Sequence, residues 1–305
     1  MKKKIFAVLI SVFLVSGACL KADPGDNAAA FLRIGVGAGP SAMAEAYSGV
    51  CGDILSHYYN PAGLASLEGY NFSLSHALWF EDISYSNFVA GMPLLDGYAA
   101  LGVSGLFAGE IDKYNWQGDD MDDTYSPSDI AVSGSYSRVI TTGVSAGAAL
   151  KFITYEIDGD RASAVALDIG AMKKLGDINL GLSLQNLGTE MKFRDEGDPL
   201  PFIARLGASY PFDLSVFNML AVAETNFSTE VPFKFNAGVK ADYPAGEFLL
   251  SLRLGVKSYA EGLDALSHLT TGFGVEYSDI VFDYGFASFE DLGLTHRVSL
   301  GYRLN

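Results

Sequence analysis

Apolar and polar residues alternate with a period of two along most of the chain beyond residue 70. In residues 247–257, every second position from Phe248 to Val256 is apolar, and the residues between them are mostly polar or small. Residues 142–154, 177–187 and 233–243 repeat this pattern. Because successive side chains of a strand point to opposite faces, each segment predicts a β-strand with one apolar face and one mostly polar or small face.

Fourteen segments of about ten residues carry this alternation. They are 70–79, 83–92, 98–108, 128–139, 142–156, 162–173, 177–188, 202–211, 217–227, 233–242, 247–256, 268–278, 280–288 and 294–304. A soluble β-sandwich also alternates, but its strands are usually shorter, whereas a tilted membrane strand needs this length. The pattern therefore predicts an all-β fold, a fourteen-stranded antiparallel transmembrane β-barrel over residues 70–305.

The connections between these segments fall into two classes of length. Those after even-numbered strands are mostly tight, whereas those after odd-numbered strands include the three longest, residues 109–127, 189–201 and 257–267. Bacterial single-chain barrels have an even number of strands, short periplasmic turns and long outer loops. We therefore expect residues 109–127 on the cell surface and the tight turn at 244–246 in the periplasm.

The first residues predict an exported protein. Three lysines at positions 2–4 precede an apolar run over residues 5–15, and small residues follow. This is the layout of a secretory signal peptide, and its apolar run is too short for a membrane-spanning helix. We expect a signal peptide over residues 1–22 with cleavage after Ala22. Lipoprotein processing at Cys19 is the alternative, against which Ser16, three places earlier, is an unfavourable residue.

Residues 23–69 lack the alternation and are apolar and rich in glycine. They contain a predicted short helix from Ser41 to Tyr47 and an Asn60-Pro61 step, where the proline biases the preceding residue to an extended conformation. A fourteen-stranded barrel has more interior than its own side chains fill, so we expect this segment to fold into the lumen as a hatch. The candidate ligand-path residues on it are Phe31, Leu32, Arg33, Ile34, Gly35, Gly37, Gly39, Asn60 and Pro61.

Charge and hydropathy narrow the class of protein. The signal peptide holds four of the 20 Lys and Arg residues and none of the 36 Asp and Glu residues, so the remaining chain has a formal charge of −20. That charge argues against nucleic acid as a partner. Mean hydropathy is positive at +0.21, yet no apolar run of 18 residues follows residue 15. Only Cys51 remains after cleavage, so we expect no internal disulfide.

No motif in the chain predicts an enzyme, a cofactor site or a metal site. Gly35, Gly37 and Gly39 lack the spacing and context of a dinucleotide fingerprint. The four histidines have no metal-ligand spacing, and there is no Gly-x-Ser-x-Gly elbow; a His-based hydrolase site at the rim stays as a minor alternative for His76 and His268. The histidines are His57, His76, His268 and His296. Asp119, Asp120, Asp122 and Asp123 predict a solvated acidic loop rather than a calcium site, because EF-hand spacing is missing.

Several segments together resemble a known family of outer-membrane barrels. They are Phe31 to Gly39, Ser41 to Ala46, Tyr59-Asn60-Pro61-Ala62-Gly63-Leu64, Ala164 to Gly170, Gln185 to Gly188, and Thr295 to Leu300. The chain is similar over nearly its whole mature length to PorV/PorQ-type proteins (uncharacterised protein family 0164) among the FadL-like outer-membrane barrels. The resemblance implies a fourteen-stranded barrel with an N-terminal hatch. It also implies one of two functions: transport of long-chain fatty acids and other hydrophobic molecules, or an accessory role in a protein secretion and surface-attachment system.

Two functions from different classes therefore remain. The first is an outer-membrane transporter of small hydrophobic ligands, with lipid around its wall. The second is a structural barrel that binds a secretion-system protein and carries no small-molecule cargo. The residues predicted to face inward include Asp168, Lys234, Lys240, Asp242, Arg253 and Glu276. They suit a polar lumen, and a transporter would need an apolar pocket joining the hatch to the wall.

Overall fold

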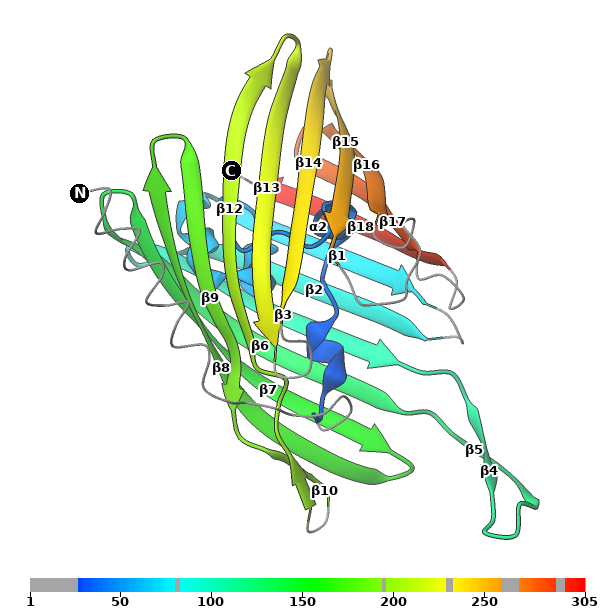
Figure 1. Ribbon diagram of the computed structural model, residues 1–305. Coiled ribbons are helices and arrows are strands. Elements are labelled where there is room, and N and C mark those ends of the chain that lie inside the picture. The colour runs from blue at the N-terminus through cyan, green and yellow to red at the C-terminus, as the bar shows by residue number, and fades with distance from the viewer. Residues whose placement is uncertain are drawn as a thin grey trace.

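A closed antiparallel barrel forms the body of the protein (Figure 1). The computed structural model describes residues 27–79, 83–193, 196–228, 233–258, 269–288 and 294–304. The wall consists of β1 (Tyr70–Leu78), β2 (Ser84–Leu94), β3 (Gly97–Phe107), β6 (Ser128–Thr141), β7 (Val144–Ile157), β8 (Asp160–Leu175), β9 (Ile178–Gly188), β12 (Ile203–Leu214), β13 (Phe217–Ser228), β14 (Lys234–Ala245), β15 (Phe248–Lys257), β16 (Leu269–Tyr277), β17 (Ile280–Ser288) and β18 (Leu294–Leu304).

The pairing of β18 with β1 closes the wall. Their register runs from Tyr70 opposite Leu304 to Leu78 opposite His296, and every other wall strand pairs with its neighbours in the same antiparallel sense. The fourteen predicted strands are thereby confirmed, with boundaries that differ by no more than three residues. Closure removes the free edges, so the backbone N–H and C=O groups of the wall are paired within the sheet, as a lipid environment requires.

The two faces of the wall differ in chemistry as the alternation predicts. Outward-facing Leu101, Leu150 and Leu252 are 60–69% exposed, whereas inward-facing Ser133 and Arg253 are buried. An apolar outer face over long strands cannot be solvated cheaply by water and suits the hydrocarbon core of a bilayer. The fold is therefore that of a membrane-spanning barrel. Among the described residues, no helix is both long and apolar enough to cross a membrane.

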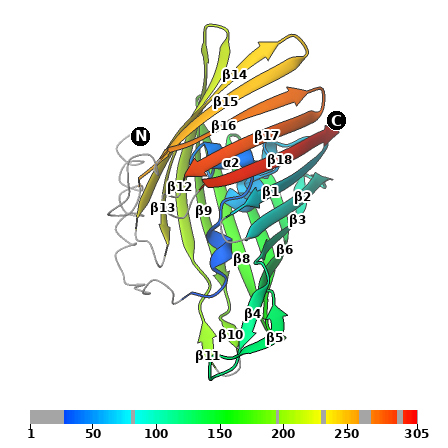
Figure 2. The same cartoon turned by 90° about the vertical axis from the view of Figure 1, so that its right-hand side faces the viewer.

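The end of the barrel with the long connections carries two additional hairpins. β4 (Ile111–Tyr114) pairs with β5 (Asp120–Tyr125), and β10 (Met191–Phe193) pairs with β11 (Glu196–Asp198). The β4–β5 hairpin projects well beyond the wall (Figures 1 and 2). The β10–β11 hairpin packs back on β8, and its Met191 is 1% exposed. The two predicted loops thus contain regular structure, because their short alternating runs pair with each other locally.

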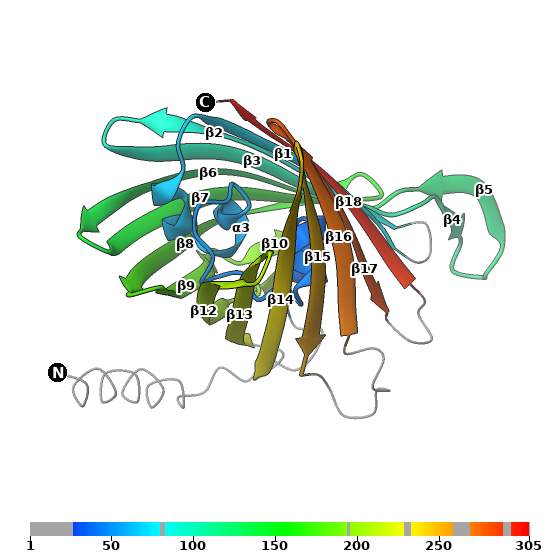
Figure 3. The ribbon, with the colours of Figure 1, turned by 90° about the horizontal axis from the view of Figure 1, so that it is seen from above.

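The N-terminal segment, residues 27–69, lies inside the barrel and is followed directly by β1 (Figure 3). It contains the short helices η1 (Ala30–Arg33), α2 (Ala38–Ala42), α3 (Ser56–Tyr59) and η2 (Pro61–Ser66). The helix predicted from Ser41 to Tyr47 is wrong: α2 begins earlier and ends at Ala42, because Ala44 and Glu45 have left-handed backbones with φ of 57° and 61°. The predicted signal peptide and Cys19 lie outside the described residues.

Candidate ligand path in the barrel lumen

Glycines of the wall allow the backbone of the N-terminal segment to touch the sheet. A Cβ atom added at Gly181 would overlap the carbonyl of Ser48, and one added at Gly147 would lie 2.6 Å from the carbonyl carbon of Pro61. Both glycines face the lumen from neighbouring parts of the wall, on β9 and β7. Side chains at these positions would therefore hold the segment away from the wall, and glycine permits the close approach.

One side of the segment is bound to strands near the barrel seam. The guanidinium of Arg297 on β18 donates hydrogen bonds to the carbonyl of Gly35 and to the hydroxyl of Ser41. Thr270 on β16 accepts from the Ala44 amide at 3.1 Å and donates to the Ala42 carbonyl at 3.0 Å. The Ala42 carbonyl is at the C-terminal end of α2, where the last carbonyl groups of a helix lack intrahelical partners, and Thr270 supplies one.

Glu45 adds a charged contact to the same side. Its carboxylate lies 3.0 Å from the ammonium of Lys257 on β15. Burial alone would raise the pKa of Glu45, but the positive charges of Lys257 and Arg297 outweigh it and lower this pKa to about 2. The carboxylate is therefore ionised at any physiological pH, and the ion pair holds a residue whose backbone is in the left-handed region.

The other end of the segment is bound to the opposite wall through the Asn60-Pro61 step. Asn60 is extended, with φ −159° and ψ 101°, and its side-chain oxygen accepts from the Ala62 amide at the start of η2. Its side-chain nitrogen donates to the Ser48 carbonyl at 2.8 Å. The Ala62 carbonyl accepts from the hydroxyls of Ser137 and Ser145. The bend therefore ties two turns of the segment together and to the wall.

His57 is buried between two wall serines and not in a metal or catalytic arrangement. Its Nδ1 and Nε2 lie 2.7 Å and 2.6 Å from the hydroxyls of Ser135 and Ser133. Burial, together with the positive charge of Lys151, lowers the pKa of His57 to about 3. The imidazole is therefore neutral near pH 7 and serves as a hydrogen-bonding spacer between segment and wall.

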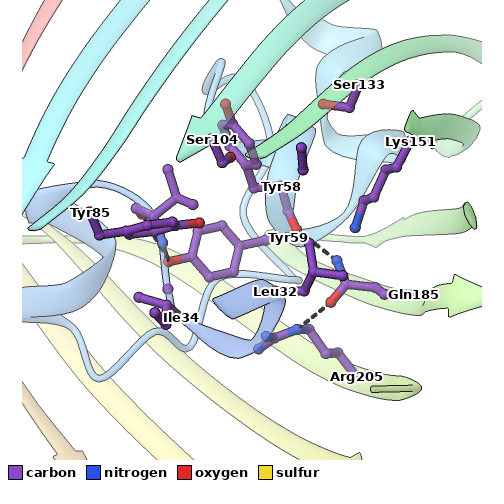
Figure 4. Close-up of a pocket in the computed structure, with 13 residues that line it drawn as sticks. Leu32, Ile34, Tyr58, Tyr59, Tyr85, Ser104, Ser133, Lys151, Gln185 and Arg205 are labelled. Carbon is purple, nitrogen blue, oxygen red and sulfur yellow. Dashed lines mark hydrogen bonds between the residues drawn. The ribbon is translucent and has the colours of Figure 1, made fainter. Parts of the chain in front are cut away.

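A small cavity lies where the segment meets strands β2, β3, β6, β7, β9 and β12 (Figure 4). Its volume is about 30 Å³, room for one or two water molecules. Pockets for drug-sized ligands occupy roughly 300–1,000 Å³, so this cavity has no space for such a ligand in this position of the segment. The lining residues are Leu32, Ile34, Gly35, Val36, Tyr58, Tyr59, Tyr85, Ser104, Ala131, Ser133, Lys151, Gln185 and Arg205.

The cavity combines an apolar and aromatic side with a polar side. Leu32 and Ile34 lie beside the rings of Tyr59 and Tyr85 (Figure 4). Across from them, Arg205 donates to the side-chain oxygen of Gln185 at 2.7 Å. The sequence prediction named Leu32, Ile34 and Gly35 but missed the wall residues, whose only signal was a polar residue at an inward position of a predicted strand.

The remaining predicted hatch residues have other surroundings. Phe31 is 2% exposed and packs edge-on against the ring of Tyr85 at a centroid distance of 6.5 Å. Arg33 lies at the end of η1 and does not line the cavity. Gly37 has φ of 85° at the start of α2, and Gly39 lies within α2 against Asp283. The structure therefore distributes the predicted ligand-path residues over three places: the cavity, the contact of α2 with the wall, and the Asn60-Pro61 bend.

A bulge in β9 explains how one strand supplies two adjacent lumen residues. Gln185 and Asn186 are both 3% exposed, and the register between β8 and β9 shifts here. Asn186 has φ of 61°, and its amide donates to Asp168, whose carboxylate lies 2.7 Å from the Lys151 ammonium. β-Bulges re-aim side chains in this way. The alternation alone would have placed one of the two residues outside.

Charged pairs line the described part of the lumen, as the predicted inward charges suggested. Nitrogen–oxygen distances of 2.7–3.0 Å join Arg205–Glu224, Lys151–Asp168, Arg253–Asp283, Lys240–Asp242 and Lys257–Glu45. Glu276 pairs with Arg303 at 3.2 Å nearer the mouth. In each of these pairs the two opposite charges compensate one another, as a low-dielectric interior requires.

The predicted acidic loop and the scattered histidines lie away from the cavity. Asp119, Asp120, Asp122 and Asp123 are exposed on the β4–β5 hairpin, where Lys113 lies 2.7 Å from Asp123. His76 and His296 face outward; His76 contacts the Ser86 hydroxyl and His296 the Tyr284 hydroxyl. His268 lies outside the described residues.

The fold has counterparts among solved structures of channels. The toluene transporter TodX of Pseudomonas putida aligns with a TM-score of 0.60 at 13% identity, covering 89% of this chain and 99% of that chain. The monoaromatic hydrocarbon channel CymD aligns with a TM-score of 0.57 at 12% identity, covering 89% and 98%. At such identity the likeness shows the fold alone, a closed antiparallel barrel.

The sequence comparisons give no finer assignment. No protein-family model matches the chain, and no curated protein matches it. The resemblance to PorV/PorQ-type proteins therefore stays a prediction that rests on the quoted motifs.

Proposed function

We propose that this protein is an outer-membrane channel for small hydrophobic molecules, gated by its N-terminal segment. The single observation that carries the proposal is the small cavity between the segment and the wall, lined by Leu32, Ile34 and tyrosines. The barrel fold shared with proteins described as a toluene transporter and a monoaromatic hydrocarbon channel supports it. The predicted signal peptide supports export to the outer membrane.

The residues around the cavity favour an amphipathic ligand such as a long-chain fatty acid. Lys151 and Arg205 place two cations beside the polar side of the cavity, where a carboxylate would find charge-assisted donors. The apolar side and Phe31 behind it would contact the ligand tail. Since both cations are already paired with carboxylates, the ligand would have to compete with these pairs or bind after they rearrange.

Gating follows from the size of the cavity. A ligand that does not fit while the segment is docked can bind only when the segment is displaced, and it then shifts the equilibrium toward the displaced form. In this proposal residues 23–69 are the hatch, Gly35, Gly37 and Gly39 serve as its hinges, and Asn60 with Pro61 anchors it. The close packing of Gly35 and Gly39 means that the hinges would act only after the surrounding contacts release.

Ligand binding by purified protein tests the proposal directly. Native mass spectrometry of detergent-purified protein should show a co-purified lipid or an added labelled long-chain fatty acid at one copy per barrel. Toluene, which lacks a polar group, should compete less well than the fatty acid. Absence of binding by both ligands, in protein that is folded and migrates as a heat-modifiable barrel, would reject transport of hydrophobic molecules as the function.

A second function is favoured by one specific feature, the β4–β5 hairpin. It projects beyond the wall (Figure 2) and carries Trp116, 91% exposed, and Tyr114, 60% exposed, next to exposed aspartates. Exposed aromatic residues are frequent anchors of protein interfaces. A PorV-like barrel would bind a secretion-system protein through such a loop and carry no ligand. Specific binding lost on Trp116→Ala, in protein that binds no lipid, would favour this alternative.

A further inference from the structure

Three wall residues on adjacent strands converge on the N-terminal segment at one place. Gln185 lies on β9, Arg205 on β12 and Glu224 on β13, and these strands are neighbours in the wall. Their side chains are 3%, 7% and 1% exposed. Arg205 joins them, because its Nε donates to Gln185 at 2.7 Å and its Nη1 to Glu224 at 2.8 Å.

Glu224 is bound to the segment by two successive backbone amides. Its Oε2 accepts from the Tyr47 amide at 3.1 Å and from the Ser48 amide at 2.8 Å. Hydrogen bonds to an ionised carboxylate are stronger than those between neutral groups. A carboxylate buried to 1% exposure depends on such donors, and undocking of the segment would remove two of them.

The other two residues bind the segment ten residues further along the chain. Gln185 donates from Nε2 to the Tyr58 carbonyl at 2.6 Å, and the Arg205 guanidinium stacks 5.5 Å from the ring centroid of Tyr59 (Figure 4). Two separate turns of the segment are therefore bound by one connected network. Because its members share Arg205, loss of one contact weakens the others.

From this arrangement we propose that Gln185, Arg205 and Glu224 form a latch, a set of positioning residues that fixes the N-terminal segment in its docked position. The latch borders the cavity, so displacement of the segment would expose Arg205 and Gln185 to a ligand. An effect of the latch on transport depends on the proposed gating function. An effect of the latch on docking of the segment does not depend on it, and the experiment below measures docking alone.

Cys51 is a native probe for the docking equilibrium. It is exposed, lies three residues beyond Ser48, and is the sole cysteine beyond Cys19. A nitroxide spin label on Cys51, with Cys19 removed by cleavage or replaced by serine, reports the mobility of the segment without any ligand. Glu224→Gln keeps the shape of the side chain and removes its charge. We expect it to raise the ratio of mobile to immobile label about tenfold or more.

Asp168→Asn is the matched control. Asp168 is also a fully buried carboxylate on the lumen side, but its partners, Lys151 and the Asn186 amide, belong to the wall. The label on Cys51 in the Asp168→Asn protein should keep the mobility that it has in the unsubstituted protein. Equal mobility in both variants would mean that any loss of lumen charge releases the segment, and would overturn the latch.

A second variant protects the test against failure of the first to fold. Gln185→Ala removes the bond to the Tyr58 carbonyl without changing charge, and it should also mobilise the label. Folding of each variant is checked by heat-modifiable migration. Label mobility in a folded latch variant that equals the mobility in the unsubstituted protein would overturn the proposal. Failure of both variants to fold would also overturn it, because the network would then serve the stability of the wall.

Discussion

Ser251 and Leu252 are neighbours in β15 whose side chains lie on opposite faces of the barrel wall. The Ser251 hydroxyl donates to Asp242 at 2.6 Å in the lumen, whereas Leu252 is 68% exposed on the outer face. We expect Leu252→Arg to lower the free energy of unfolding by about 2–4 kcal/mol, because it places a charge in the hydrocarbon region. Ser251→Arg should cost much less, since Asp242 can pair with the new cation. A denaturant titration of folding into vesicles measures both; equal losses would contradict a membrane wall in this register.

The orientation of the barrel can be tested with protease on intact cells. The β4–β5 hairpin carries Trp116 and Tyr114 in exposed positions, and the opposite end carries the tight turn at Gly246. Chymotrypsin added outside should cleave near Trp116 and leave the turn at 244–246 intact, because long loops of outer-membrane barrels face outward. A protease site engineered at Gly246 serves as the comparison, and its cleavage in intact cells would reverse the orientation.

Gly181→Ala should displace the N-terminal segment without unfolding the barrel. The added methyl group would overlap the Ser48 carbonyl, which belongs to the latch region of the segment. Gly134→Ala is the control, because the nearest atom to its added Cβ is the end of the Leu101 side chain at 3.4 Å. We expect Gly181→Ala alone to increase proteolysis of the segment in folded, heat-modifiable protein. Unchanged protection would mean that the segment adapts to a shifted backbone.

Deletion of residues 27–39 should leave a folded barrel that no longer binds a labelled long-chain fatty acid. The deletion removes η1 and the cavity residues Leu32 and Ile34 but keeps the latch contacts of residues 47–59. The wall strands pair only with one another, so heat-modifiable migration should persist. Fatty-acid binding that equals that of the intact protein would place the ligand site elsewhere.

His57 should make docking of the segment sensitive to acid. Its pKa is about 3 when buried, against 6.5 for a free side chain, so the undocked form takes up a proton first as the pH falls. Docking stability is therefore complete above pH 6.5 and decreases below it, by about 2 kcal/mol at pH 5. Protease protection of residues 27–69 at pH 7.5 and pH 5 measures this loss. The His57→Gln protein should show a smaller difference between the two pH values. Glu45 stays ionised in the docked form over this range, because its pKa there is about 2.

The alternation of side chains was sufficient to predict the wall. The period of two in β15, with Leu250, Leu252 and Leu254 on one face, depends only on local strand geometry and on the need for one face to meet lipid. The same reasoning found all fourteen wall strands, because the side-chain pattern and the strand length are both properties of neighbouring residues in the chain.

The contents of the lumen were decided by contacts between residues far apart in the chain. Glu224 lies 176 positions from Ser48, and no periodicity in either segment predicts that the carboxylate of one binds the amide of the other. Nothing in the sequence distinguishes Gly181 from other small residues in strands. Only the structure shows that the Ser48 carbonyl lies against it. The sequence by itself determined the barrel, because strand alternation is a local property. Only the tertiary structure decided how the segment docks, because its buried charges and backbone groups bind partners on wall strands that come close to the segment only when the barrel closes.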